Sequence, residues 1–142
     1  MKYLLLSLLL CLVPLKNFAQ NQDLPVPPII DDGFKKYKMK GLVDALKEWN
    51  QFDIKSKNDA SKLTTFQEAE KTYDKYVDFD VVDYVELSRR NALVYVIVNY
   101  EKGPLFVLFT VFYPDNKWIV SRINASLDVK DVFPDYIWTR TK

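Results

Sequence analysis

Side chains that commonly carry acid–base or metal chemistry are scarce in this sequence. It contains no histidine, and its single cysteine, Cys11, lies within an apolar N-terminal run. Zinc sites and histidine-based proton relays require these side chains, so the sequence excludes both and predicts no metal and no cofactor. Any chemistry must therefore rest on carboxylates, phenols and arginines that the fold brings together.

Asp83 and Arg122 are the charged residues that best fit a site, because each interrupts an apolar strand pattern. The simplest hairpin registers predict one row across the sheet, made of Asp83, Val96, Phe109 and Arg122. A few charges in an apolar pocket can orient a ligand, so Asp83 and Arg122 are candidate binding residues, although charges at such positions more commonly have no binding role. The alternative is that each lies at a sheet edge and reaches solvent or a helix end.

Three aromatic residues complete the candidate binding set: Trp49, Tyr100 and Phe109. The two strand residues share the predicted face of Asp83, whereas Trp49 lies on the apolar stripe of a predicted helix, where core packing is the commoner role. Asp83 is also the one acid that the register places inside. An isomerase or lyase with Asp83 as general base is therefore an alternative, which requires a pKa raised by burial and a nearby donor.

An antiparallel meander is predicted over residues 79–87 and 91–127. Both segments are rich in β-branched and aromatic residues, and turn residues at 101–104 and 114–117 divide the second one into three strands. One predicted face is mainly apolar and is expected against helices. The other face is mixed but too apolar for solvent, which predicts either a second copy of the sheet or cover from the terminal segments.

Two amphipathic helices are predicted over residues 33–50 and 63–76, because apolar residues recur there at spacings of three and four. Glu70 is the one acid of the second helix that drifts toward its apolar stripe. The proline-rich residues 21–32 are expected to form an extended spacer or a strap over the domain. Residues 128–142 predict a short apolar helix or strap, broken at Pro134, that docks on its own domain or serves a partner.

Residues 1–20 have the features of a secretory signal peptide, with a basic start, an apolar run and a predicted cut after residue 19 or 20. The run of about ten residues is too short to cross a membrane, so no transmembrane anchor is expected. Lipid attachment at Cys11 is less favoured because the bulky Leu10 precedes it. Removal of this segment changes the formal charge from +1 to −1 and leaves no basic patch for nucleic acid. We expect a chain exported to the periplasm or outside the cell.

Residues 33–127 resemble the NTF2-like superfamily, in which a curved sheet wraps a long helix to form a cone. The resemblance rests on element order and on the segment NYEKGPLFVLFTVFYPDNKWIVSRINAS, which looks like the last hairpins of small secreted bacterial members. It implies a single α+β domain over residues 33–142; a cystatin-like fold is the alternative. Enzymes of the superfamily place an Asp or His base and Tyr or Asp donors inside the cone. Here Asp83 is the only acid predicted inside, and Tyr100 and Tyr113 share its face but lie near the strand ends, so no catalytic set is carried over.

The leading functional hypothesis is an exported, non-enzymatic binding domain. It would recognise a small apolar molecule in an apolar pocket, or an envelope partner or a second copy of itself through the sheet. The isomerase or lyase based on Asp83 is one alternative, and a structural or assembly role in the cell envelope is the other.

Overall fold

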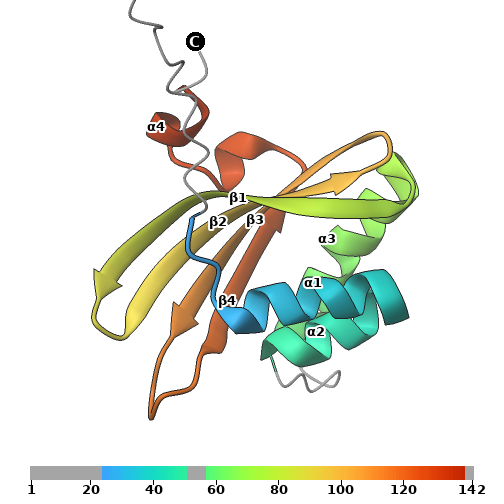
Figure 1. Ribbon diagram of the computed structural model, residues 1–142. Helices are drawn as coiled ribbons and strands as arrows, with labels where there is room; N and C mark the ends of the chain where they lie inside the picture. Colours follow the sequence, from blue (N-terminus) through green and yellow to red (C-terminus); the bar gives the residue numbers. More distant parts are fainter. Residues whose placement is uncertain (1–23, 51–56, 140–142) are drawn as a thin grey trace, which may run out of the picture.

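The computed structural model describes residues 24–50 and 57–139. In this part of the chain, three helices precede a four-stranded antiparallel sheet with the strand order β1-β2-β3-β4. The elements are α1 (Pro28–Lys40), α2 (Leu42–Asn50), α3 (Lys57–Tyr73), β1 (Tyr76–Ser88), β2 (Asn91–Tyr100), β3 (Gly103–Phe112), β4 (Ile119–Ser126), η1 (Val129–Asp131) and α4 (Asp135–Trp138). The sheet is curved and open, with α1, α2 and α3 on one side and α4 on the other (Figure 1). The predicted α+β class is thus confirmed.

The first helical region differs from the prediction at both of its boundaries. α1 begins at Pro28, because a proline at the first helical position loses no hydrogen bond there. Residues 28–32, predicted as spacer, are therefore helical, and Ile30 is buried in the core. The predicted single helix over 33–50 is broken at Gly41, whose φ of 92° suits glycine and ends α1. The predicted signal peptide lies outside the described residues.

The third helix is longer at its start than predicted and shorter at its end. α3 begins at Lys57, whereas the apolar stripe predicted a start at residue 63, and it ends at Tyr73. Asp74 follows with a positive φ of 72°, which stops the helix before β1 begins at Tyr76. Because three helices precede the sheet among the described residues alone, the prediction of two is wrong.

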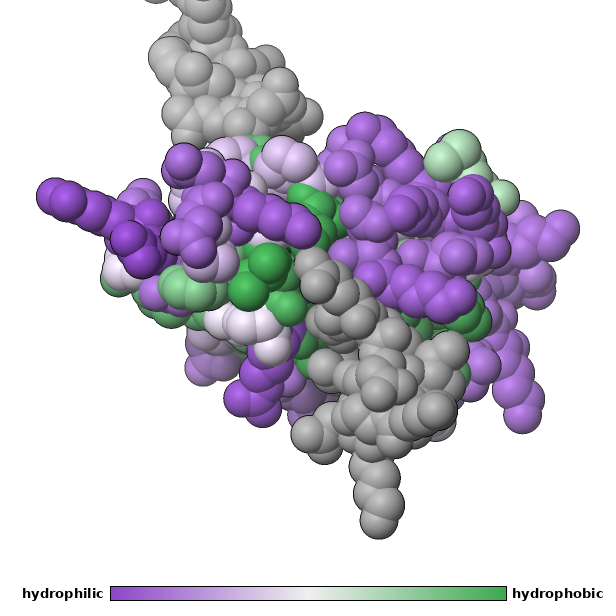
Figure 2. Space-filling view, turned by 90° about the horizontal axis from the view of Figure 1, so that it is seen from below, coloured by the Kyte–Doolittle hydropathy of each residue, from purple (hydrophilic) through white to green (hydrophobic). Residues whose placement is uncertain are grey.

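The main core lies between the helices and the concave face of the sheet. Phe34 of α1 and Trp49 of α2 meet edge to face, with ring centroids 4.7 Å apart, and the Trp49 ring lies 5.1 Å from that of Phe109 on β3. The alternation predicted for β2 and β3 holds, because buried residues on this face alternate with half-buried ones along β3. Seen from below, most of the coloured residues on the visible face are hydrophilic, and a smaller hydrophobic area lies between them (Figure 2).

Irregular pairing in the two edge strands overturns the predicted placement of Asp83 and Arg122. In β1, Val81 pairs with Val96, but after a register shift Asp83 pairs with Tyr95. In the pairing of β3 with β4, Arg122 faces Thr110, whereas Ile123 faces Phe109. Because side chains alternate between the two faces, one extra residue in a strand moves those that follow to the other face.

A second, smaller hydrophobic cluster covers the convex face of the sheet. Phe133 and Ile137, from the segment that contains η1 and α4, pack against Tyr95 of β2, and all three side chains are buried. For this mixed face the sequence predicts either a second copy of the sheet or cover from the terminal segments. The C-terminal segment covers it, so the second prediction is confirmed for that segment. Among the described residues, no helix is both long enough and apolar enough to cross a membrane.

Candidate functional site

The aromatic residues of the predicted site are distributed between the core and a polar network. Trp49 and Phe109 have no exposed surface, and the indole Nε1 of Trp49 donates a hydrogen bond to the carbonyl oxygen of Ile30 at 3.2 Å. Phe34 and Trp49 therefore fill the space where an apolar pocket was expected. Tyr100 is also buried, but its hydroxyl forms a hydrogen bond with the hydroxyl of Tyr37.

Asp83 and Arg122 join neither of these groups, because both lie on the convex face of the sheet. An Asp83 carboxylate oxygen accepts a hydrogen bond from the backbone N–H of Tyr84 at 3.0 Å. The exposed Arg122 donates from Nε to the side-chain oxygen of Asn124 at 3.1 Å. The predicted row that combined both charges with Phe109 is therefore wrong.

The structure instead reveals a chain of hydrogen bonds that links β2, α1 and α3. The Tyr37 hydroxyl donates to Oε1 of Glu70 at 2.8 Å, and the hydroxyls of Tyr37 and Tyr100 are 2.9 Å apart. A phenol has one proton to donate, so Tyr37, which donates to Glu70, accepts from Tyr100. The chain therefore runs from Tyr100 through Tyr37 and ends on the Glu70 carboxylate.

Burial keeps the phenols of this region in their protonated form at neutral pH. It raises the pKa of Tyr37 far above its ordinary value, with further increases from the adjacent Tyr100 and Glu70. Burial likewise raises the pKa of Tyr100. At Tyr76, burial and the neighbouring Asp78 and Asp31 carboxylates raise the pKa to about 12. The hydroxyl groups of Tyr100 and Tyr37 therefore keep their protons, and the hydrogen bonds that they donate are directed toward Glu70.

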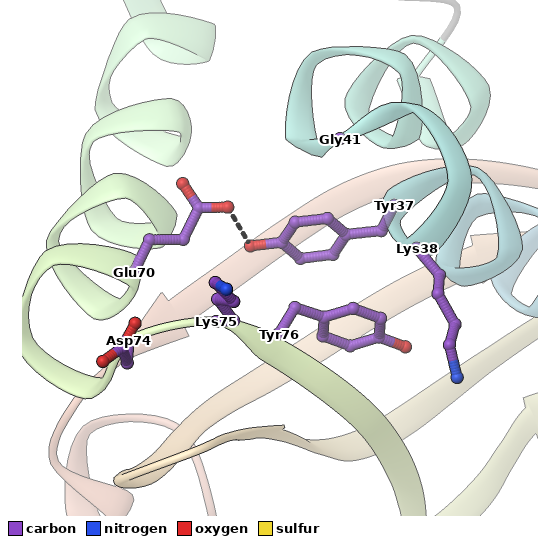
Figure 3. Close-up of a pocket in the computed structure, with 7 residues that line it drawn as sticks. All are labelled: Tyr37, Lys38, Gly41, Glu70, Asp74, Lys75 and Tyr76. Atoms are coloured by element: carbon purple, nitrogen blue, oxygen red, sulfur yellow. Dashed lines mark hydrogen bonds between the residues drawn. The ribbon is translucent and has the colours of Figure 1, made fainter.

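The hydrogen-bond chain ends at Glu70 in a cleft of about 410 Å³, which we call the Glu70 cleft (Figure 3). It is lined by Tyr37, Lys38, Gly41, Glu70, Asp74, Lys75 and Tyr76. The rings of Tyr37 and Tyr76 stack with centroids 4.4 Å apart and planes 7° from parallel, and so form an aromatic wall. Figure 3 shows one carboxylate oxygen of Glu70 bonded to Tyr37 and the other directed away from it.

The charges that line the Glu70 cleft are only partly neutralised by neighbours. Asp74 forms an ion pair with Lys102 at 2.9 Å. Among the side chains that the structure describes, which are those of residues 24–49 and 63–139, Lys38 and Lys75 form no ion pair, and Glu70 has no hydrogen bond besides that from Tyr37. The cleft thus offers one carboxylate oxygen to a donor and two ammonium groups to an acceptor.

Helix ends and turns hold the residues that line the Glu70 cleft in place. Tyr37 lies one turn before the end of α1, and Glu70 lies one turn before the end of α3. The β2–β3 turn is tied to the α3–β1 connection, because the backbone N–H groups of Lys102 and Glu101 donate to the carbonyl oxygens of Tyr73 and Lys75. Backbone hydrogen bonds therefore fix this side of the cleft.

Comparison with known proteins gives no family for this chain. No family model matches it, and neither a curated protein nor a solved structure shows significant similarity to it. The NTF2-like resemblance therefore stays a prediction from the sequence, and the candidate site rests on the geometry of the chain itself.

The residues of the Glu70 cleft were only partly visible in the sequence. The sequence indicates only that Glu70 is an acid near an apolar stripe, which is the pattern expected of a half-buried carboxylate with a partner. Its partner Tyr37 lies 33 residues earlier and looked like an ordinary core position. No local pattern connects two such residues on different helices.

Proposed function

We propose that the protein is a non-enzymatic binding domain that holds a small polar molecule in the Glu70 cleft. The observation that carries the proposal is the hydrogen-bond chain that ends on a half-buried carboxylate inside a cleft of about 410 Å³. Clefts that bind small molecules typically have volumes of about 300–1,000 Å³ and contain a few oriented polar groups. The neutral phenols hold Glu70 in one orientation before any ligand arrives.

The lining residues favour a ligand with two kinds of polar group. A hydroxyl or ammonium group would donate to the remaining oxygen of Glu70, and a carboxylate or phosphate would accept from Lys38 or Lys75. The Tyr76 ring offers a flat apolar contact beside them. The ligand proposed here is therefore polar rather than apolar, because aromatic side chains fill the interior of the domain.

Export and membership of the NTF2-like superfamily complete the proposal. The features of residues 1–20 support export, and the order of helices and strands supports the family. The alternative base Asp83 has no support from the geometry, because it lies on the convex face. Dimerisation through that face is disfavoured, since Phe133 and Ile137 cover part of it.

The proposal can be tested by ligand-observed NMR with a panel of small hydroxylated carboxylates and zwitterions. A panel member should bind the wild-type protein, and Glu70→Gln should weaken its binding at least tenfold while the fold is retained, because glutamine still accepts from Tyr37. Glu68→Gln, on the exposed side of the same helix, is the matched control and should bind normally. Equal binding by Glu70→Gln and wild type, or no binding by any member, would refute the proposal.

A further inference from the structure

A second cleft, of about 430 Å³, lies where the first turn of α1, the end of α2 and the β3–β4 turn meet. The part of its lining that matters here consists of Pro28, Ile29, Asp32, Glu48, Tyr113 and Trp118. None of these residues belongs to the Glu70 cleft. We call this the Trp118 cleft.

A tight turn holds the two aromatic residues of the Trp118 cleft together. The rings of Tyr113 and Trp118 lie 4.8 Å apart at an angle of 44°. Between them, Asp115 and Asn116 adopt positive φ values, and the backbone N–H of Lys117 donates to the carbonyl oxygen of Pro114 at 2.9 Å. The conformation of this turn therefore holds the rings of Tyr113 and Trp118 together without a ligand.

Two carboxylates form the polar part of the lining. Asp32 comes from α1 and Glu48 from α2, and their side chains are 54% and 30% exposed. Asp32 forms a loose ion pair with Lys35, whose ammonium lies 3.7 Å from a carboxylate oxygen, a distance too long for a hydrogen bond. Glu48 uses Oε2 to pair with Lys36. Within the described chain, Oε1 of Glu48 has no hydrogen bond, so each carboxylate retains capacity for a donor.

We propose that the Trp118 cleft binds an organic cation, specifically the guanidinium of an arginine side chain. The electron-rich faces of Trp and Tyr attract cations, and a planar guanidinium can stack on a ring while its N–H groups reach a carboxylate. Pro28 and Ile29 provide apolar contact for the aliphatic stem. An anion is disfavoured by Asp32 and Glu48, and an apolar ligand would strip water from both carboxylates without replacing it.

Of the described residues that line this cleft, Lys117 is the one with a cationic side chain. Its side chain is exposed, so it can turn toward solvent when another cation enters. Its charge should nevertheless oppose binding, and its removal should strengthen binding. This expectation separates recognition of a cation from nonspecific contact with the aromatic rings.

The test uses the indole N–H resonances of the three tryptophans in the mature, ¹⁵N-labelled protein. N-acetyl-L-arginine amide is added up to about 50 mM, which detects sites with a millimolar Kd. The resonance of Trp118 should shift, whereas Trp49 in the core and Trp138 on the convex side should not. N-acetyl-L-citrulline amide, which is similar in shape but neutral, is the matched control and should cause no shift. Equal shifts with both compounds, or no shift of Trp118, would overturn the proposal.

Substitutions at several lining residues test arginine binding without reliance on any single side chain. Tyr113→Leu should weaken binding about three- to thirtyfold, the range expected for loss of a cation–π contact. Glu48→Gln should weaken it about two- to fivefold, as for a partly exposed ion pair, and Lys117→Ala should strengthen it. Weaker binding by Lys117→Ala would contradict the proposal. Glu70→Gln should leave arginine binding unchanged, so the outcome does not depend on the Glu70 cleft.

Discussion

Substitution of Gly33 by alanine should destabilise the domain, although alanine is the better helix former. Gly33 is buried in α1, and a Cβ atom at this position would overlap the indole ring of Trp49. Helix propensity alone favours alanine by about 1 kcal/mol. Overpacking of a core costs about 1–3 kcal/mol. Displacement of the indole would also break the hydrogen bond to Ile30 and leave a buried donor unpaired, at a cost of about 1–3 kcal/mol.

The balance for Gly33→Ala is a loss of about 1–5 kcal/mol in the free energy of unfolding, because both losses act against the small gain in propensity. Urea unfolding followed by far-ultraviolet circular dichroism measures it, provided that the slope with urea concentration stays unchanged. A neutral or stabilising effect would show that Trp49 does not pack on this face of α1.

Two controls separate packing from backbone strain. Gly41→Ala introduces a Cβ with no atom within 4 Å, but at a φ of 92° and a ψ of 177°, a backbone region that is almost restricted to glycine, so it should cost about 1–3 kcal/mol from backbone strain alone. The double substitution Gly33→Ala with Trp49→Phe should cost less than the sum of the single ones, because the smaller ring leaves room for the methyl group. Additive effects would contradict direct contact between the two residues.

Three further outcomes are expected. Above about pH 10 the wild-type free energy of unfolding should fall more steeply than that of Tyr37→Phe, by about 1.4 kcal/mol per pH unit, because the raised pKa of Tyr37 keeps the folded state protonated while the unfolded phenol ionises. Urea unfolding at several pH values between about 9 and 11, which bracket the ordinary pKa of a tyrosine, measures the difference. Phe133→Ala should cost about 3–5 kcal/mol and promote self-association, because it uncovers Tyr95 on the convex face; unfolding and analytical ultracentrifugation test this. Lys102→Ala should leave the urea midpoint unchanged, because its ion pair with Asp74 is exposed to solvent.

The central strands were predictable because their pattern is regular. β2 and β3 pair without a shift, so the period of two in the sequence assigns Val96 and Phe109 to the buried face. The edge strands were not predictable to the same degree. The sequence pattern does not indicate the extra residue that shifts the register beside Asp83 or Arg122. This shift nevertheless moves the charged side chain to the opposite face of the sheet.

The candidate site was harder to predict than the fold, because it depends on contacts between elements. The chain from Tyr100 to Tyr37 to Glu70 joins residues from one strand and two helices. Each helix pattern records burial but not the identity of the partner side chain. The break at Gly41, which lies in the lining of the Glu70 cleft, required the backbone angle of one glycine within an otherwise helical pattern.

The cover on the convex face also has a consequence for the order in which the protein folds during synthesis. Phe133 and Ile137 leave the ribosome after all four strands of the sheet have emerged. A nascent chain that has already assembled its meander therefore exposes Tyr95 and the apolar side chains around it until the final segment arrives. In that interval the uncovered apolar side chains of the convex face make the chain prone to aggregation, and docking of the last helix removes that hazard.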